Sequence, residues 1–297
     1  MQEHAPHTPP QMTKEQQQAR LDSIKKTWEQ RRQISRQLGK IKTKIGVYSG
    51  KGGVGKTTVS VNLAVYLAHK GYTVGLLDAD IDCPNVTKVM GIVNRPEYVE
   101  GRLNPAESYG VKVISMSFFQ EKEDEAIIWR GPMVHNAINQ FIQMTNWGDL
   151  DFLLVDLPPG TSDAPLTVMQ VLSLDGFVMV TTPQKLAALD ARRSINMVRK
   201  MNVDVLGIVE NFSGEVFGSG AGEALAKDLE LPYLGALELR AAYRDDSMPS
   251  VLAVSDIMDE YDAIWDRLKP VMSAVNKLPE QRDAAPEATP APKEPTA

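Results

Sequence analysis

The segment Gly50–Thr58, GKGGVGKTT, constrains the fold more than any other part of the chain. It satisfies the pattern GxxxxGK[ST], in which glycines let the backbone curl so that several N–H groups point inward at a phosphate. The apolar run Lys44–Ser49 precedes it and a helical pattern over Thr57–Lys70 follows it. A helix that starts at such a loop adds its positive N-terminal end to the anion site. The order strand, loop, helix therefore predicts an α/β fold that binds a nucleotide.

Short apolar runs alternate with helical patterns along most of the chain. The runs are continuous rather than alternating, which is typical of strands buried on both faces. This alternation predicts a doubly wound, mostly parallel α/β sheet of about seven to eight strands flanked by helices. The predicted strands are Lys44–Ser49, Thr73–Asp78, Val111–Ser115, Phe152–Asp156, Gly176–Thr181, Val203–Glu210 and Pro232–Leu237. The predicted helices include Thr57–Lys70, Pro132–Met144, Leu186–Met201, Gly220–Leu229 and Ile257–Val275.

The two ends of the chain differ in composition from its body. Residues 1–19, rich in Gln, Pro and His, and residues 279–297, rich in Pro and Ala, lack apolar periodicity and are predicted to be disordered tails. Residues 20–43 are predicted to form a basic helical arm. Its role stays open between a solvated helix and contact with nucleic acid, anionic lipid or a partner subunit. The remaining residues, 44–278, are predicted to form one folded domain that contains the phosphate loop.

Composition excludes several classes of protein. With 43% hydrophobic and 24% charged residues the chain is typical of a folded protein in water. No apolar run approaches the ~18 residues that a membrane helix needs, and the N-terminus lacks the apolar core of a signal peptide. The single cysteine, Cys83, excludes an internal disulfide and a cysteine-based zinc site. We expect a cytoplasmic protein.

The phosphate loop supplies most of the predicted binding residues. Lys56 is expected to neutralise the β- and γ-phosphates of ATP, and the Thr57 hydroxyl to bind Mg²⁺. The whole predicted set is Gly50, Gly52, Gly53, Val54, Gly55, Lys56, Thr57 and Thr58.

Acidic residues follow two of the predicted strands, at the sheet edge where parallel α/β sheets bind ligands. Asp80 is placed to orient or deprotonate an attacking water, and Asp78 could lie nearer the metal. Asp82 fits the cap of a following helix better. Asp156 ends an apolar run in the Walker B pattern and is predicted to hold Mg²⁺.

Two residues keep two interpretations on spacing alone. Lys51, a second lysine inside the loop, is either solvated or serves a nucleotide in a facing subunit, as an arginine finger does. Asn211 follows a predicted strand, and its amide could bond a purine edge or belong to an ordinary turn.

Several segments carry a resemblance. SGKGGVGKTT resembles the deviant Walker A motif of the MinD/ParA/nitrogenase-iron-protein superfamily, whose mark is the extra lysine, here Lys51. LLDADIDCPN, IIWRGPMVHNAINQF, DFLLVDLPPGTSDA, VTTPQKLAALDARRSINM and VLGIVENFSG resemble the Mrp/ApbC family of iron–sulfur cluster carriers, over roughly residues 41–275. The resemblance implies a P-loop NTPase fold and a slow, Mg²⁺-dependent ATPase. It implies a homodimer in which Lys51 crosses the interface, with Asp80 in switch I, Asp156 in switch II and Asn211 on adenine. Apoproteins that receive a cluster are the implied partners.

The chain departs from that family in its thiolates. The family commonly carries a CxxC pair after the strand that ends here at Asn211, which gives a dimer four thiolates for a bridging [4Fe–4S] cluster. The corresponding stretch, Glu210–Gly218, has no cysteine. A dimer of this chain offers only two thiolates, both from Cys83 in the switch I segment. An iron–sulfur cluster is therefore a doubtful ligand.

The missing pair keeps an alternative open, namely a MinD/ParA-like dimerisation switch that positions or matures a partner without carrying a cluster. MinD-like proteins usually end in an amphipathic membrane helix, whereas this sequence ends in Pro and Ala. We expect neither a membrane nor a nucleic-acid partner.

Overall fold

The computed structural model describes residues 38–119, 131–245 and 248–280, together with nine single residues between Thr13 and Arg36. The single residues from Gln18 onward are helical, and Leu38 is buried. The predicted disordered tails lie almost entirely outside the described residues, as do Trp129 and Arg130 of the WRGPM segment.

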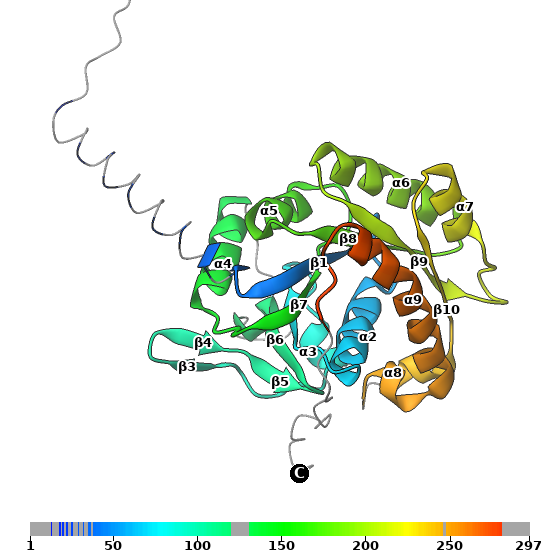
Figure 1. The fold of residues 1–297 in the computed structure, drawn as a ribbon, viewed down its shortest axis with the longest axis horizontal. Helices are drawn as coiled ribbons and strands as arrows, with labels where there is room; N and C mark the ends of the chain where they lie inside the picture. Colours follow the sequence, from blue (N-terminus) through cyan, green and yellow to red (C-terminus); the bar gives the residue numbers. More distant parts are fainter. Residues whose placement is uncertain are drawn as a thin grey trace, which may run out of the picture.

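The core of the molecule is an eight-stranded sheet in the order β10-β9-β8-β1-β7-β2-β6-β5 (Figure 1). All neighbouring strands are parallel except β5 and β6, which pair antiparallel at one edge. The prediction of a doubly wound, mostly parallel sheet is therefore confirmed. Its strands are β1 (Ile41–Ser49), β2 (Val74–Asp78), β5 (Ala106–Ser108), β6 (Val111–Ser115), β7 (Leu150–Asp156), β8 (Gly176–Thr181), β9 (Val205–Ser213) and β10 (Tyr233–Glu238). A separate hairpin pairs β3 (Glu97–Val99) with β4 (Arg102–Asn104).

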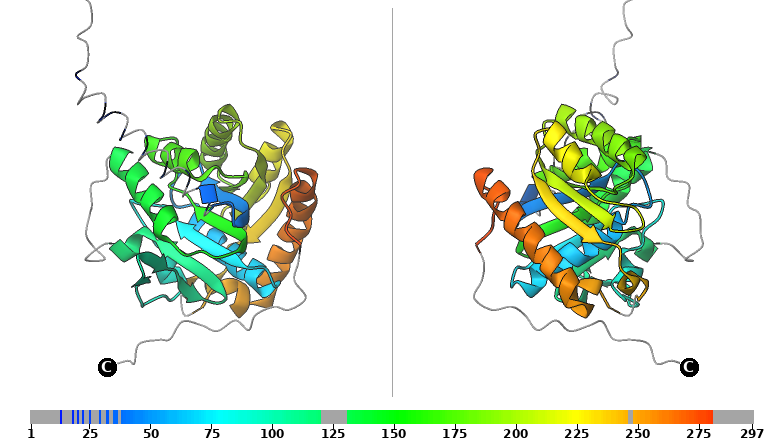
Figure 2. Two further views of the ribbon diagram at one scale, coloured as in Figure 1. Left: turned by 60° about the vertical axis from the view of Figure 1, so that its left-hand side comes forward. Right: turned by 90° about the vertical axis from the view of Figure 1, so that its right-hand side faces the viewer.

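Helices cover both faces of the sheet (Figures 1 and 2). One face carries α2 (Lys56–His69), α3 (Val86–Val89), α8 (Ser250–Ala253) and α9 (Ser255–Ala274). The other carries α4 (Gly131–Met144), α5 (Asp163–Leu172), α6 (Lys185–Lys200) and α7 (Ala221–Asp228). Each face has its own apolar core, and all seven residues of β7 are buried between the two. Burial of the strands on both faces explains why their apolar runs in the sequence are continuous.

The first strand begins earlier than predicted. β1 starts at Ile41 rather than Lys44, so the last residues assigned to the basic arm belong to the sheet. Ile41 and Thr43 are buried, whereas Lys42 is exposed. At the start of the strand, buried and solvent-facing residues alternate. The solvent-facing residues are lysines, so this section resembles the basic arm in composition.

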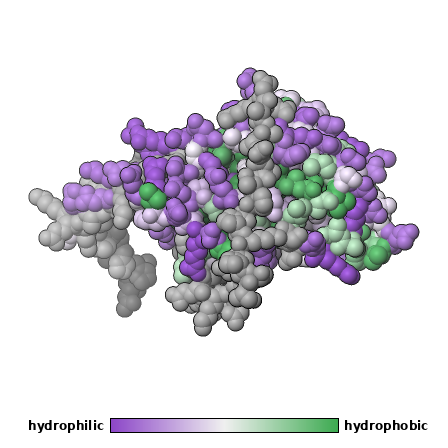
Figure 3. Space-filling model, turned by 90° about the horizontal axis from the view of Figure 1, so that it is seen from below, coloured by the Kyte–Doolittle hydropathy of each residue, from purple (hydrophilic) through white to green (hydrophobic). Residues whose placement is uncertain are grey.

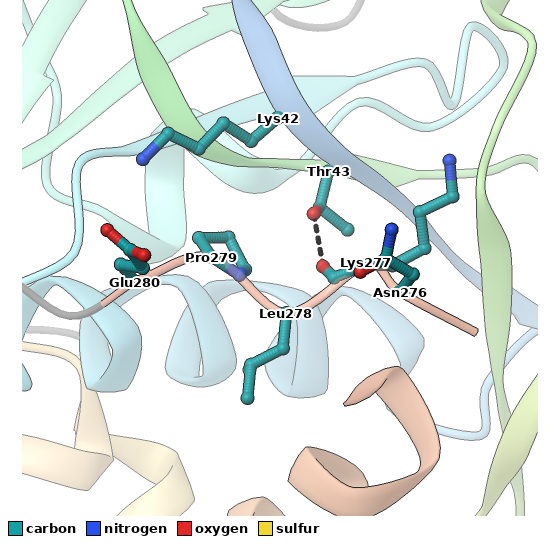
Figure 4. Close-up of a pocket in the computed structure, with 7 residues that line it drawn as sticks. All are labelled: Lys42, Thr43, Asn276, Lys277, Leu278, Pro279 and Glu280. Carbon is teal, nitrogen blue, oxygen red and sulfur yellow. Dashed lines mark hydrogen bonds between the residues drawn. The ribbon is translucent and has the colours of Figure 1, made fainter. Parts of the chain in front are cut away.

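The chain returns to the start of β1 after α9. Thr43 Oγ1 donates to the carbonyl of Lys277, and residues 276–280 pass in front of the strand (Figure 4). Seen from below, the surface of the described residues is mostly hydrophilic, with apolar side chains gathered on the right-hand side (Figure 3). Among the described residues, no helix has both the length and the apolar character needed to cross a bilayer.

Candidate functional site

The phosphate loop joins β1, a central strand, to the first residue of α2. Gly53 and Gly55 have φ angles of 77°, in the left-handed region that favours glycine. A methyl group on Gly50 would lie 2.2 Å from the carbonyl carbon of Asp190 in α6, so the backbone can pass α6 only because Gly50 has no side chain. The loop thus adopts the curled path that its glycine spacing predicts.

Lys56 is buried among carboxylates at the start of α2. Its side chain is 6% exposed, with Nζ 2.9 Å from Asp156 Oδ1 and 3.5 Å from Asp80 Oδ2. Despite these ion pairs, Nζ makes no hydrogen bond of regular geometry with any described residue. A buried ammonium group needs hydrogen-bond acceptors, and phosphate oxygens would supply them. Lys56 therefore fits the predicted contact with a nucleotide's phosphates.

Thr57 and Asp156 meet where the predicted metal would lie. Thr57 Oγ1 donates to Asp156 Oδ2 over 2.7 Å, and the fully buried Asp156 ends β7, the strand beside β1. Ser60, one turn further along α2, lies with Oγ 2.6 Å from Asp156 Oδ1. Mg²⁺ prefers oxygen ligands such as hydroxyl and carboxylate groups, so Thr57 and Asp156 fit the predicted metal site. Sequence reasoning missed Ser60, although its spacing four residues after Lys56 places it on the same helix face.

Asp78, at the end of β2, holds the turn that follows the strand. Its carboxylate accepts hydrogen bonds from Ser115 Oγ (2.8 Å) and from the backbone N–H groups of Val86 and Asp80 (3.2 Å each). Full burial, followed by the charge of Asp156, raises its pKa well above the ordinary value. The bond to Val86 also corrects the expectation that Asp82 caps the next helix, because Asp82 is exposed and Asp78 holds the first N–H of α3.

Asp80 lies close to the lysine of the phosphate loop. Burial raises the pKa of its carboxyl group, and the charge of Lys56 opposes that shift. Asp80 Oδ1 accepts a hydrogen bond from the backbone N–H of Cys83, 3.3 Å away. Cys83 itself is exposed and free. One carboxylate oxygen of Asp80 therefore faces Lys56, and the other accepts a hydrogen bond from the turn.

Lys51 contacts the residue that precedes α6. Its Nζ lies 3.3 Å from Gln184 Oε1, just before α6, at an exposed position. The contact of Lys51 with a nucleotide in a facing subunit stays a prediction.

Asn211 lies against the phosphate loop. Its side chain is 1% exposed, and Nδ2 donates to the carbonyl of Val54 over 2.9 Å. The adenine contact stays a prediction, and in this structure the amide fixes the loop. The preceding Glu210 is also buried and accepts the N–H groups of Gly220 and Gly222 at the start of α7.

The segment after β9 forms a tight turn without a cysteine. Gly214 and Gly218 exchange two backbone hydrogen bonds, of 3.0 and 2.7 Å, which close a tight turn. Its tip presents Val216 and Phe217, 75% and 40% exposed. Within the described residues, no group of three or more histidine, cysteine, aspartate or glutamate side chains is arranged to hold a metal ion.

Comparison with known proteins places this site in a family context. Residues 40–269 match the family model described as "ParA: NUBPL iron-transfer P-loop NTPase". The chain is 45% identical over 235 residues to the iron–sulfur cluster carrier protein of Synechocystis sp., covering 73% of this chain and 66% of that protein. It is 40% identical over 259 residues to the iron–sulfur cluster carrier protein of Methanococcus maripaludis, covering 82% and 90%.

Two solved structures of nucleotide-binding proteins resemble the fold of this chain. A nucleotide-binding protein from Archaeoglobus fulgidus, solved in complex with ADP, superposes with a TM-score of 0.62 at 34% identity, covering 79% of this chain and 91% of that one. The cell division ATPase MinD of Pyrococcus furiosus has the same TM-score at 22% identity, covering 77% and 99%, and this likeness concerns the fold alone.

Proposed function

Because the chain belongs to the family of ParA/NUBPL iron-transfer P-loop NTPases, we propose that it binds and hydrolyses Mg²⁺-ATP as a homodimer, and that it serves the assembly of iron–sulfur clusters or their transfer to apoproteins. The observation that carries this proposal is the buried Lys56 ammonium group, which lies beside Asp156 and Asp80 without a regular hydrogen bond among the described residues. We also propose a cytoplasmic location.

In the proposed reaction, residues Gly50–Thr58 enclose the phosphates and Lys56 neutralises their charge. Thr57 and Asp156 would hold Mg²⁺, and the bound ion would supply positive charge to the phosphate oxygens. Asp80 orients the attacking water from the turn after β2. Lys51 reaches the facing subunit's nucleotide and stabilises its transition state. Hydrolysis then relaxes the turns that carry Asp80 and Asp156, and the dimer opens.

One observation favours a second candidate function. The tight turn closed by Gly214 and Gly218 has no thiol, and the exposed Cys83 lies in another segment. A nucleotide-dependent dimerisation switch that positions or matures a partner needs the same ATPase site and no cluster ligands. The two functions therefore share ATP binding and hydrolysis, and they differ in whether the protein binds iron.

Iron and sulfide analysis of anaerobically purified protein, alongside ATPase assays over a range of protein concentrations, tests both parts. We expect Mg²⁺-dependent turnover per subunit that rises with protein concentration as dimers form. Stoichiometric iron and sulfide, with absorbance near 400 nm, would establish the carrier role. An active protein without iron would favour the switch, and an inactive protein at every concentration would refute the ATPase.

A further inference from the structure

Phe212, next to Asn211 in β9, has an unusual backbone conformation. Its φ angle is 59°, in the left-handed region that a bulky side chain seldom occupies. The pairing with β10 skips it, because Asn211 pairs with Leu237 and Ser213 pairs with the next residue, Glu238. Phe212 is therefore the extra residue of a β-bulge. Such strained positions persist only when surrounding contacts stabilise them, and they concentrate at functional sites.

The bulge changes where two consecutive side chains point. Successive residues of a regular strand face opposite sides of the sheet, so Asn211 and Phe212 would normally diverge. In this structure both reach Gly55. A methyl group on Gly55 would lie 2.2 Å from Asn211 Nδ2 and 2.8 Å from Phe212 Cζ. The left-handed residue thus lets one strand end hold the phosphate loop at two points.

Gly55 is the residue at which the loop becomes a helix. It caps the N-terminus of α2 with a φ angle of 77°, and Lys56 follows it directly. The orientation of the first N–H groups of α2 and the origin of the Lys56 side chain both depend on its position. Because the Phe212 ring occupies the space where a side chain of Gly55 would lie, it limits the motion of this junction.

We propose that Phe212 is a positioning residue for nucleotide binding, whose aromatic ring holds Gly55 in place and so preorganises the phosphate loop for the triphosphate. This inference rests on the proposed function, since nucleotide binding is its readout. The ring acts through the loop, so it contributes to the affinity for any ligand that carries the triphosphate, with or without a base.

Phe212→Gly and Phe212→Ala separate this role from simple packing. Both remove the ring, and glycine also accepts the left-handed conformation without strain. We expect Phe212→Gly to be the more heat-stable of the two. We expect both variants to bind Mg²⁺-ATP and Mg²⁺-tripolyphosphate at least about tenfold more weakly than wild type, by the same factor for each ligand. Phe217→Ala, on the exposed tip of the next turn, is the matched control and should bind both like wild type.

Calorimetric titration of the four proteins with both ligands decides the matter, with thermal unfolding recorded in parallel. Wild-type affinity in a folded Phe212→Gly variant would overturn the inference while leaving the proposed function intact. A loss for ATP with unchanged tripolyphosphate binding would also overturn it, because the ring would then act on the base. If wild type itself bound neither ligand, the proposed function would fall and this inference with it.

Discussion

Buried carboxylates at the two ends of the parallel sheet differ in how fully lysines compensate their charge, and β7 contains one such carboxylate at each end. Asp151 near its start and Asp156 at its end are both fully buried. Near the start, Asp151 pairs with Lys42, and the neighbouring Asp175 pairs with two lysines at 2.7 and 2.9 Å. At the other end, Lys56 pairs with Asp156 and Asp80, and Asp78 lies close enough for its pKa to respond to the lysine.

The pKa shifts follow this difference. Burial alone would raise the pKa of Asp151, but hydrogen bonds from Thr73 and Lys42 bring it below the ordinary value. At the other end, burial raises the pKa of Asp80, and the nearby lysine does not fully compensate. Two carboxylates, those of Asp156 and Asp80, pair with the single ammonium group of Lys56, and a divalent cation would neutralise the excess negative charge. The ion pairs near the start of β7 therefore stabilise the fold. At the carboxyl end of the sheet, unfavourable interactions of buried carboxylates remain, and a bound ligand would relieve them.

The largest effect that would sharpen this comparison is expected for Lys56→Ala. Loss of the ammonium group removes the main charge facing the phosphates, so the affinity for Mg²⁺-ATP should fall by about 100-fold or more. Lys42→Ala, at the opposite end of the sheet, is the matched control. Lys42 is half exposed and Thr73 also donates to Asp151, so the loss of Lys42 should lower the free energy of unfolding by only about 1 kcal/mol and leave nucleotide affinity unchanged. Calorimetric titration and urea unfolding of both variants measure the contrast, and similar binding losses in the two would contradict it.

Lys51→Ala should come next, with an effect on turnover rather than on binding. If Lys51 acts across the dimer as an arginine finger does, kcat should drop by about 10²-fold or more, with ATP affinity within about threefold of wild type. Mixing the Lys51→Ala and Lys56→Ala variants gives heterodimers in which the intact Lys51 of one subunit faces the intact loop of the other. Activity should return in the mixture. No recovery in demonstrably mixed dimers would show that Lys51 does not act in trans.

A smaller effect, confined to stability, is expected for Asp175→Asn at the amino end. Burial opposes but does not cancel the hydrogen bonds from Lys277 and Lys44 that lower the pKa of Asp175. A depressed pKa contributes stability above the unfolded value near 4, and that stability is lost as the pH falls through the folded pKa. The variant should unfold about 1–3 kcal/mol more easily at pH 7.

Urea unfolding of the Asp175→Asn variant and wild type should show this difference at pH 7 and a much smaller one near pH 3. A difference that does not depend on pH would argue against the ion pairs as its source. Mg²⁺-ATP affinity at pH 7 should match wild type, since the substitution lies at the opposite end of the sheet from the phosphate loop.

Local patterns were sufficient to predict most of the sheet and the phosphate loop. The strand Gly176–Thr181 has the predicted bounds because both faces are buried and its apolar run is unbroken. The helix α5 was not predicted, since Pro165 and the preceding Pro- and Gly-rich turn hide its start, although proline is tolerated in a first turn. The strand Glu97–Val99 is exposed throughout and gives no apolar signal.

Contacts between distant segments explain what sequence could not supply. Ser115 reaches Asp78 only because β6 pairs with β2, and no local spacing reveals this bond. The bulge at Phe212 depends on the register of β9 against β10. The side chain of Asn211 donates a hydrogen bond to the carbonyl of Val54, which is 157 positions away in the chain. A motif can identify residue types, whereas these orientations arise from strand pairing.

The smallest effect is expected for Cys83→Ser, which tests whether the exposed thiol belongs with the ligand-binding end of the sheet. The hydrogen bond from Cys83 to Asp80 comes from the backbone N–H, and serine keeps that group. ATP affinity and turnover should therefore stay within about twofold of wild type. Iron analysis of the same anaerobic preparations gives the sharper readout. If wild type retains stoichiometric iron and Cys83→Ser loses it, the two thiolates of a dimer take part in holding a cluster, and the carrier function no longer requires the missing CxxC pair. Equal iron in both proteins would separate Cys83 from any cargo.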